Sequence, residues 1–354
     1  MMKKQMKAAI LNKPKDIEVK QVPIPEPKRN EALVKVHCIG VCGSDVHYYE
    51  HGRIGRYVVE KPIILGHEVS GTVVQLGAEV KNIRIGDRVA IEPGIPCGEC
   101  AYCRSGRYNL CGAVEFMATP PYDGAWAEYV TVNSEFLFKL PDHVSFEEGA
   151  LIEPLSVGFH AMRRGKVGPG DTLLITGLGP IGLLAIEAAK MFGVTEIYGS
   201  DVVGFRRDLA LQMGVKGVMD PTKGDLLEQF RQVSGNKEID VLIETSGNVQ
   251  AVSDTIRLVK RGGKIVYVGL PTVNQVPMDM TAMIDAEIDM LGVFRYVHTY
   301  ADAIQSLDHP LVDLTKVITD QYSLDEIKKA VEVALNEKEK SIKVMIYPNA
   351  EDIK

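Results

Sequence analysis

The chain has 354 residues, of which 45% are hydrophobic and 25% charged, the proportions of a folded globular protein rather than a disordered one. Its 40 lysines and arginines against 47 aspartates and glutamates give a formal net charge of −7, which argues against a general binder of nucleic-acid phosphates. No run approaches the roughly 20 apolar residues of a membrane helix, and residues 1–14 lack the apolar core of a secretion signal. We therefore expect a cytoplasmic protein of about two domains, with no nucleic-acid or membrane partner.

The first part of the chain predicts many short strands. Runs rich in β-branched residues are separated by Gly, Pro and Asn, and Pro23, Pro25 and Pro27 form a stiff connector. We expect an antiparallel, barrel-like domain whose loops carry function. The expected strands cover residues 7–12, 16–22, 32–38, 69–76, 88–92 and 127–132.

Near residue 155 the pattern changes to alternating strands and helices. Strands are expected at 172–176, 196–201, 239–245 and 264–269, and helices at 180–192, 206–213 and 249–260. This alternation predicts an α/β fold with a parallel, doubly wound sheet. After about residue 294 the pattern is mixed: Ser323 and Glu326 form a capping box that opens a helix to about Leu335, and 342–347 is a final strand.

A glycine-rich segment in the second part predicts a dinucleotide site. Residues 177–182 fit G-x-G-x-x-G between an expected strand and an expected helix, and Asp201 ends the next strand. The glycines allow a tight turn and a close approach of the pyrophosphate to the helix N-terminus, while the carboxylate would accept hydrogen bonds from the ribose. Its charge repels the 2′-phosphate of NADP, so we predict NAD; Arg206 and Arg207 weaken this preference, because a nearby arginine can hold that phosphate. The predicted NAD contacts are Gly177, Gly179, Pro180, Ile181, Gly182, Asp201, Arg206 and, at the end of a parallel strand, Val268, Gly269 and Leu270.

Four of the 6 cysteines are close together in the sequence and predict a metal site. Cys97, Cys100, Cys103 and Cys111 read C-x2-C-x2-C-x7-C, and four thiolates close a tetrahedral zinc site with no open position, so its role is structural. An iron–sulfur cluster is the rival interpretation, but the ferredoxin run ends C-x3-C-P, whereas this one ends C-x7-C-G.

A second candidate metal set combines Cys42 with the later pair His67 and Glu68. Each residue alone has an ordinary interpretation: a core thiol, a loop histidine and a surface carboxylate. The surrounding glycines tie them together, because residues 66–77 read G-H-E-x2-G-x5-G. Cys38 is expected to be a buried strand thiol, and the remaining histidines, His51 among them, have no spacing that assigns them to a metal.

These motifs resemble the zinc-dependent medium-chain alcohol dehydrogenases, and the resemblance covers essentially the whole chain. Residues 42–55, 118–124, 153–158 and 294–296 are similar to the sorbitol (L-iditol) and xylitol dehydrogenase branch. The resemblance implies a GroES-like β-barrel catalytic domain at 1–155 and a Rossmann NAD-binding domain at 156–293. A C-terminal segment, 294–354, would complete the catalytic domain.

The resemblance also implies the site residues. Cys42, His67 and Glu68 would bind a catalytic zinc; Glu153 matches a family glutamate beside that zinc, and the sequence leaves open whether it or Glu68 completes the set. Two zincs per subunit are therefore expected. Asp45 is a candidate to orient His67, and Ser44 and His47 match a proton relay. The implied catalytic residues are Ser44, His47 and Glu153, and the implied substrate contacts are Ser44, Tyr48, Phe116, Thr119, Glu153, Arg295 and Tyr296.

The implied activity is an NAD-dependent oxidation of sorbitol, xylitol or L-iditol to the ketose, of the L-iditol 2-dehydrogenase or D-xylulose reductase type. A dimer or tetramer is implied as well. Two alternatives stay open: a related zinc dehydrogenase for butanediol, threonine or another secondary alcohol, and a non-catalytic zinc-binding protein on the same fold.

Overall fold

A computed structural model describes residues 4–349 and divides the chain into two compact units. The first unit contains Met1–Glu153 and Ile318–Lys354, and the second contains Pro154–Val317. The C-terminal part of the chain thus returns to the first unit, and residues 294–317, expected with the catalytic domain, lie in the second. No helix in the described range is long and apolar enough to cross a membrane.

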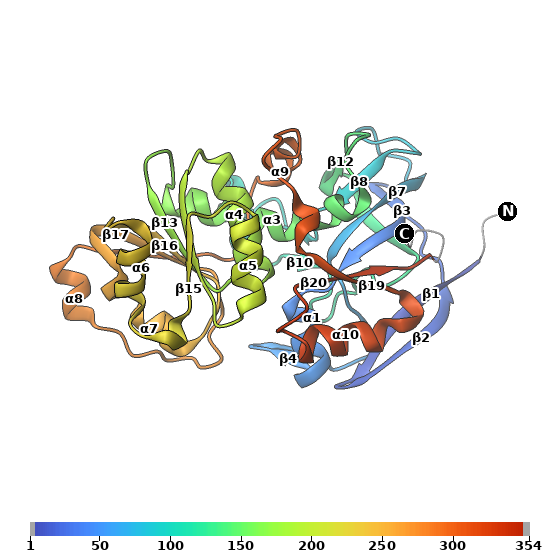
Figure 1. Cartoon of the computed structure of the whole chain (residues 1–354). Coiled ribbons are helices and arrows are strands. Elements are labelled where there is room, and N and C mark those ends of the chain that lie inside the picture. The colour runs from blue at the N-terminus through green and yellow to red at the C-terminus, as the bar shows by residue number, and fades with distance from the viewer. Residues whose placement is uncertain (1–3, 350–354) are drawn as a thin grey trace. The chain divides into compact units, whose positions relative to one another are not determined.

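The first unit is built on a seven-stranded sheet with the order β12-β8-β7-β3-β20-β19, and β11 also pairs with β3. All its pairs are antiparallel except β19 with β20. Figure 1 shows the red C-terminal strands beside the blue N-terminal ones, in agreement with the pairing of β20 with β3. Its strands are β1 (Gln5–Lys13), β2 (Asp16–Pro23), β3 (Glu31–Gly40), β4 (Arg53–Ile54), β5 (Tyr57–Val58), β6 (Ile63–Ile64), β7 (Glu68–Leu76), β8 (Arg88–Ile91), β9 (Gly94–Ile95), β10 (Glu115–Phe116), β11 (Tyr129–Asn133), β12 (Leu137–Lys139), β19 (Ile318–Ser323) and β20 (Lys343–Tyr347).

Alternating apolar side chains of these strands form the core of the first unit. Ile39, Val69 and Ile346, from three neighbouring strands, are completely or almost completely buried around Trp126. The capping box of Ser323 and Glu326 is present, although it opens a 3₁₀ turn that leads into the expected helix. The helices of this unit are α1 (Gly43–His51), α2 (Ala101–Arg104) and α10 (Ile327–Asn336), with 3₁₀ turns η1 (Tyr108–Leu110), η2 (Ser134–Phe136) and η5 (Leu324–Glu326).

The second unit has a six-stranded parallel sheet with the order β15-β14-β13-β16-β17-β18. Numbered within the unit, this is the order 3-2-1-4-5-6 of a Rossmann fold, as predicted. The strands are β13 (Thr172–Thr176), β14 (Glu196–Ser200), β15 (Gly217–Met219), β16 (Ile239–Glu244), β17 (Val259–Tyr267) and β18 (Asp289–Gly292). The helices are α4 (Pro180–Met191), α5 (Gly204–Gln212), α6 (Leu226–Ser234), α7 (Val249–Leu258), α8 (Met280–Asp285) and α9 (Tyr300–Ser306), with 3₁₀ turns η3 (Pro221–Lys223) and η4 (Leu314–Val317).

A helix that the sequence analysis did not predict, α3 (Phe146–Gly165), runs across the boundary between the units. Its N-terminal part carries Glu153, the last residue of the first unit, and Pro154 follows inside the helix. An internal proline removes a backbone hydrogen bond, which is why the sequence pattern does not indicate a helix here.

Candidate functional site: two metal centres and a dinucleotide loop

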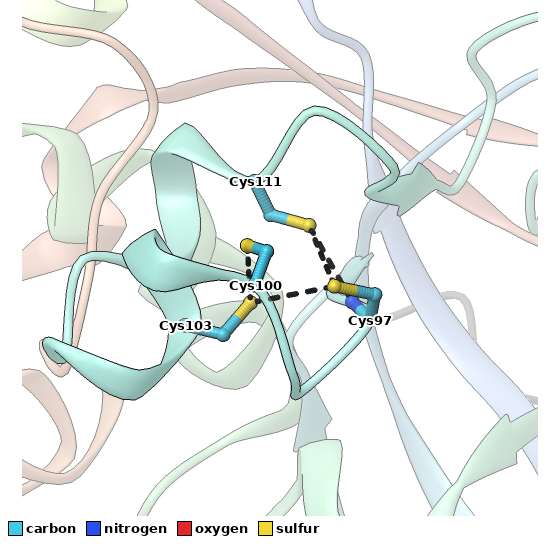
Figure 2. Close-up of side chains that lie close together, drawn as sticks. All are labelled: Cys97, Cys100, Cys103 and Cys111. Atoms are coloured by element: carbon cyan, nitrogen blue, oxygen red, sulfur yellow. Dashed lines mark hydrogen bonds between the residues drawn. The ribbon is translucent and has the colours of Figure 1, made fainter.

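The four clustered cysteines come together in space as their spacing predicts. Their sulfur atoms lie within 4.8 Å of one another, and Figure 2 shows the side chains converging from the loop before α2, from α2 itself and from the segment after η1. The sulfur–sulfur distances are 3.9 Å for Cys97–Cys103, 3.4 Å for Cys100–Cys103 and 3.5 Å for Cys97–Cys111. All four thiols are free.

This arrangement fits a tetrahedral zinc. A Zn–S bond of about 2.3 Å in a regular tetrahedron places the sulfurs about 3.8 Å apart, close to the distances found. A disulfide would need about 2.05 Å. The segment that carries the four cysteines, residues 97–111, is called the four-cysteine lobe below. It has little apolar core of its own, since α2 contains no buried residue. A metal would therefore supply much of the energy that folds it.

The second candidate metal set also comes together in the structure. One donor atom each of Cys42, His67 and Glu68 lies within 4.8 Å of the others. His67 and Glu68 are 5% and 1% exposed, while Cys42 caps the N-terminus of α1, where its sulfur receives the backbone N–H of Asp45. The donor set of one thiolate, one imidazole and one carboxylate suits zinc and leaves a fourth position for another ligand.

Asp45 organises this centre. Its Oδ2 accepts the backbone N–H of Cys42 at 3.0 Å, and its Oδ1 accepts that of Gly66 at 3.0 Å and lies 3.6 Å from His67 Nδ1. Burial alone would lower the pKa of His67, but the negative charges of Asp45 and Cys42 outweigh it and raise the pKa well above its ordinary value. The cluster is therefore strongly attractive to a cation, and a metal competes with the proton for it.

A lysine that the sequence analysis missed holds Glu68. Lys343 Nζ donates to both carboxylate oxygens of Glu68 at 2.8 Å and to the carbonyl oxygen of Val41 at 3.1 Å. Lys343 and Glu68 have side chains 2% and 1% exposed. Burial would lower the pKa of Lys343, but Glu68 and Cys42 raise it, so the side chain stays cationic. The signal in the sequence was a single lysine in the otherwise apolar last strand.

The three strands β7, β3 and β20 explain how this pair meets. Gly40 on β3 pairs with Glu68 on β7 on one side and with Met345 on β20 on the other. A Cβ at Gly40 would lie 1.9 Å from Glu68 Oε2. The missing side chain therefore makes the space in which the carboxylate reaches Lys343.

The remaining predicted residues of the first unit differ in their exposure. Glu153 is buried and does not join the set of mutually close ligand atoms, although its charge acts on Lys343 and on Glu92. Burial and, to a smaller extent, the charge of Glu153 raise the pKa of Glu92 to about 7, against the lowering effect of its hydrogen bond from Tyr108. That bond, Tyr108 Oη to Glu92 Oε1 at 2.7 Å, comes from the four-cysteine lobe.

The predicted relay and substrate residues of the first unit lie on α1, in β10 and in the loop after β10. Ser44 is half-buried and His47 exposed, while Tyr48 is buried in the apolar core. Phe116 packs edge-on against His67, with ring centroids 5.6 Å apart, and Thr119 donates its backbone N–H to Phe116. An aromatic ring thus lies directly beside the imidazole of the second candidate metal set.

The glycine-rich loop of the second unit has the geometry of a phosphate-binding turn. Gly177 follows β13 with φ +85°, and Gly179 is the N-cap of α4, which has no side-chain cap. A Cβ at Gly182 would lie 1.9 Å from the carbonyl oxygen of Gly177, so helix and strand approach closely. The backbone N–H groups at the start of α4, of which Pro180 lacks one and Ile181 keeps its own, remain available for a pyrophosphate.

Asp201, at the end of β14, is tied to this loop. It accepts the backbone N–H of Leu178 at 2.7 Å and that of Val203 at 2.8 Å. Arg206 Nη1 lies 3.8 Å from its carboxylate, and Arg206 Nε is buried without a hydrogen-bond partner among the described residues. Arg207 is engaged elsewhere, with the carbonyl oxygen of Asp201 and with Asp220 at 3.0 Å.

The loop after β17 belongs to the same edge of the sheet. The N–H groups of Val268 and Gly269 donate to the carbonyl oxygen of Glu244, at the end of β16, and Leu270 is 82% exposed. Ligands of such sheets bind outside the carboxyl ends of the strands. The three predicted residues therefore lie where the sequence analysis expected a coenzyme contact.

Arg295 and Tyr296 are in the second unit, beyond β18. Arg295 has φ +53° and its guanidinium lies over the Phe294 ring, 4.8 Å from the centroid. Tyr296 is buried against Tyr300, with ring centroids 5.7 Å apart.

Comparison with known proteins agrees with both halves of the architecture. Residues 28–142 match the alcohol dehydrogenase GroES-like domain, and residues 180–309 match the zinc-binding dehydrogenase domain. The two domains define a zinc-binding dehydrogenase. A sorbitol dehydrogenase of Bacillus subtilis is 46% identical over 97% of this chain and 98% of its own length, and one of Bos taurus is 41% identical over 97% and 96%. A crystal structure of 2R,3R-butanediol dehydrogenase from Bacillus subtilis is 32% identical, covers 97% of this chain and 100% of its own, and superposes with a TM-score of 0.89.

The chain belongs to the zinc-dependent medium-chain alcohol dehydrogenase family, in its sorbitol dehydrogenase branch. It is an oxidoreductase that acts on CH–OH groups. The predicted fold class, with a GroES-like and a Rossmann part, is confirmed.

Proposed function

We propose that this chain is a polyol 2-dehydrogenase that oxidises sorbitol, xylitol or L-iditol to the corresponding ketose, with NAD as the hydride acceptor. The observation that carries the chemistry is the convergence of Cys42, His67 and Glu68 on one point. The similarity to sorbitol dehydrogenases over 97% of the chain supports the choice of substrate class.

Cys42, His67 and Glu68 would hold the catalytic zinc, and Glu153, whose charge acts on the neighbouring Lys343, would lie beside it. When bound, zinc acts as a Lewis acid that lowers the pKa of an alcohol, which is otherwise far too weak an acid at neutral pH. Asp45 fixes the start of α1 and faces His67, which orients the imidazole for the metal. Lys343 holds the carboxylate of Glu68 in place by donating a hydrogen bond to each of its oxygens.

The proton of the alcohol must leave before hydride can transfer. Ser44 would accept it from the substrate hydroxyl while releasing its own hydroxyl proton along the relay to His47, which would pass it to solvent. The exposure of the His47 ring supports the last step, and burial and the neighbouring His51 lower the pKa of His47, so the ring is neutral and able to accept a proton near pH 7.

Substrate recognition is assigned to polar groups beside an apolar wall. Phe116, packed on His67, and Thr119 would form the wall, while Tyr48, Glu153, Arg295 and Tyr296 would contact the hydroxyl groups. Since a site built to pair several hydroxyls rejects substrates that leave its groups unpaired, we expect weak activity with ethanol.

The glycine loop and Asp201 would bind NAD. The unblocked N-terminus of α4 supports binding of the pyrophosphate, and the carboxylate of Asp201 supports a preference against a 2′-phosphate. Arg206 and the loop of Val268, Gly269 and Leu270 would complete the contacts. Hydride transfer then requires the nicotinamide to come within about 3–3.5 Å of the reacting carbon.

The four-cysteine lobe would hold a second, structural zinc, giving two per subunit. We further propose a cytoplasmic homo-tetramer or dimer, as the family resemblance implies. The similarity to a butanediol dehydrogenase structure favours one alternative, a dehydrogenase for butanediol or another secondary alcohol.

Steady-state kinetics with NAD and NADP over four- to six-carbon polyols, butanediol and threonine test this proposal. We expect the highest kcat/KM with NAD and a five- or six-carbon polyol. Strong NAD reduction by butanediol or threonine with none by sorbitol or xylitol would overturn the substrate assignment. Zinc analysis of Cys42→Ser is the companion measurement: loss of one zinc together with activity supports the catalytic centre, and an unchanged zinc content contradicts it.

A further inference from the structure

Two exposed histidines lie one helical turn apart on α1. His47 and His51 occupy positions i and i+4 of the helix Gly43–His51, so both rings are on one face. Their ring centroids are 4.7 Å apart and the rings meet edge to face. Both side chains are exposed, and that of His51 is 51% accessible.

The surroundings of the pair favour a cation. Glu50 places a carboxylate oxygen 3.3 Å from His51 Nε2. His51 is the last residue of α1, before Gly52 ends the helix in the left-handed conformation, and the C-terminal end of a helix carries partial negative charge. Near pH 7 the His47 ring is neutral, because partial burial and the neighbouring imidazole of His51 lower the pKa of His47.

We propose that His47 and His51 form a third metal site, on the surface of α1, for a divalent transition ion of the Ni²⁺, Cu²⁺ or Zn²⁺ class. Two imidazoles at this spacing chelate one ion from one helix face, and imidazole is a preferred ligand of these metals. Water completes the coordination shell, so binding is weaker than at the two centres with three or four protein ligands.

Occupation of this site inhibits the enzyme. The ion takes the lone pair of His47 that would otherwise receive the substrate proton, so proton release slows while the catalytic zinc stays in place. This consequence rests on the relay role given to His47 under the proposed function, whereas the binding itself depends only on α1.

Ni²⁺ titrated into the zinc-loaded, full-length protein without a histidine tag tests the site by calorimetry. The variants are His51→Ala and, as a matched control, His143→Ala, another exposed histidine. We expect His51→Ala to weaken the strongest nickel binding by about tenfold or more, since even outer-shell partners of a metal are worth that much. His143→Ala should bind like the parent. Equal nickel binding by the parent and His51→Ala would overturn the site.

The same proteins assayed for polyol oxidation test the inhibition. We expect His51→Ala to need about tenfold more nickel than the parent for half inhibition, each measured relative to its own nickel-free activity, with the zinc content of both proteins unchanged. If nickel binding depends on His51 but inhibition by nickel does not, the inhibitory role is overturned. A protein that binds nickel through His51 but oxidises no polyol would refute the proposed function and leave the site standing.

Discussion

Replacing Lys343 with methionine removes the only cation hydrogen-bonded to Glu68 among the described residues. The two N–O distances are both 2.8 Å, and an attraction across 2.8 Å at an effective dielectric constant of about 20 amounts to about 6 kcal/mol. Desolvation of the two charges offsets part of that attraction in the native pair. Removing one partner leaves the other charge buried, which typically costs about 3–5 kcal/mol.

We therefore expect Lys343→Met to lower the free energy of unfolding of the metal-free protein by about 3–5 kcal/mol. The zinc-loaded protein should lose less, because the metal is a second cation for the same carboxylate. Lys343→Arg keeps the positive charge and is the matched control. Urea unfolding of the first unit is followed by the fluorescence of Trp126, with and without zinc, for the parent, Lys343→Met and Lys343→Arg, which gives the six values needed.

The result that would refute this reasoning is equal destabilisation by Lys343→Met and Lys343→Arg. Such an outcome would mean that packing of the side chain, rather than its charge on Glu68, is what stabilises β20. A loss of unfolding free energy that is the same with and without zinc would separately exclude the idea that the metal replaces Lys343 as the cation beside Glu68. The double variant Lys343→Met with Glu68→Gln should recover most of the stability, since no buried charge is then left alone.

Three further changes give distinct readouts. Cys100→Ser should reduce zinc from about two to about one per chain while polyol oxidation persists; retention of both zincs would contradict the structural site. Asp201→Ala should raise the ratio of kcat/KM for NADP over NAD by about tenfold or more, because a repelling charge is removed beside Arg206, and an unchanged ratio would show that the carboxylate only shapes the loop. Glu92→Gln tests the raised pKa of about 7. The protonated Glu92 carboxyl contributes its full stabilisation to the parent below the unfolded-state pKa near 4.5, and roughly 3 kcal/mol of this is lost as the pH rises through 7. The stability of Glu92→Gln should therefore rise relative to that of the parent over this pH interval. Melting-temperature profiles that run parallel for the two proteins would contradict this expectation.

The coenzyme-binding half was the easier part to predict from sequence. Parallel strands buried on both faces are continuous apolar runs, and the strand at Thr172–Thr176 was placed without error. The helix expected at 249–260 ends at Leu258, and the strand that follows begins at Val259 rather than at 264. The strand tolerates Gly262 at φ +70°, which a sequence pattern treats as a break.

The two metal centres were not equally predictable from the sequence. The four cysteines are close in sequence, so their spacing was enough to predict their convergence. Cys42, His67 and Glu68 required the family resemblance, because the N-terminus of α1 and the start of β7 are separate in the sequence. Lys343 could not be paired with Glu68 from sequence, since the two are 275 residues apart and only the pairing of β20 with β3 brings them together.

The return of the last strand to the first unit has a consequence for synthesis on the ribosome. A chain made at about 5–20 residues per second releases Lys343 roughly 14–55 s after Glu68, since 275 residues separate them. During that interval the nascent carboxylate has no lysine beside it, although Cys42 and His67 are already made. All three candidate zinc ligands of a newly synthesised chain therefore exist before β20 does, an order that does not apply to refolding of the complete chain.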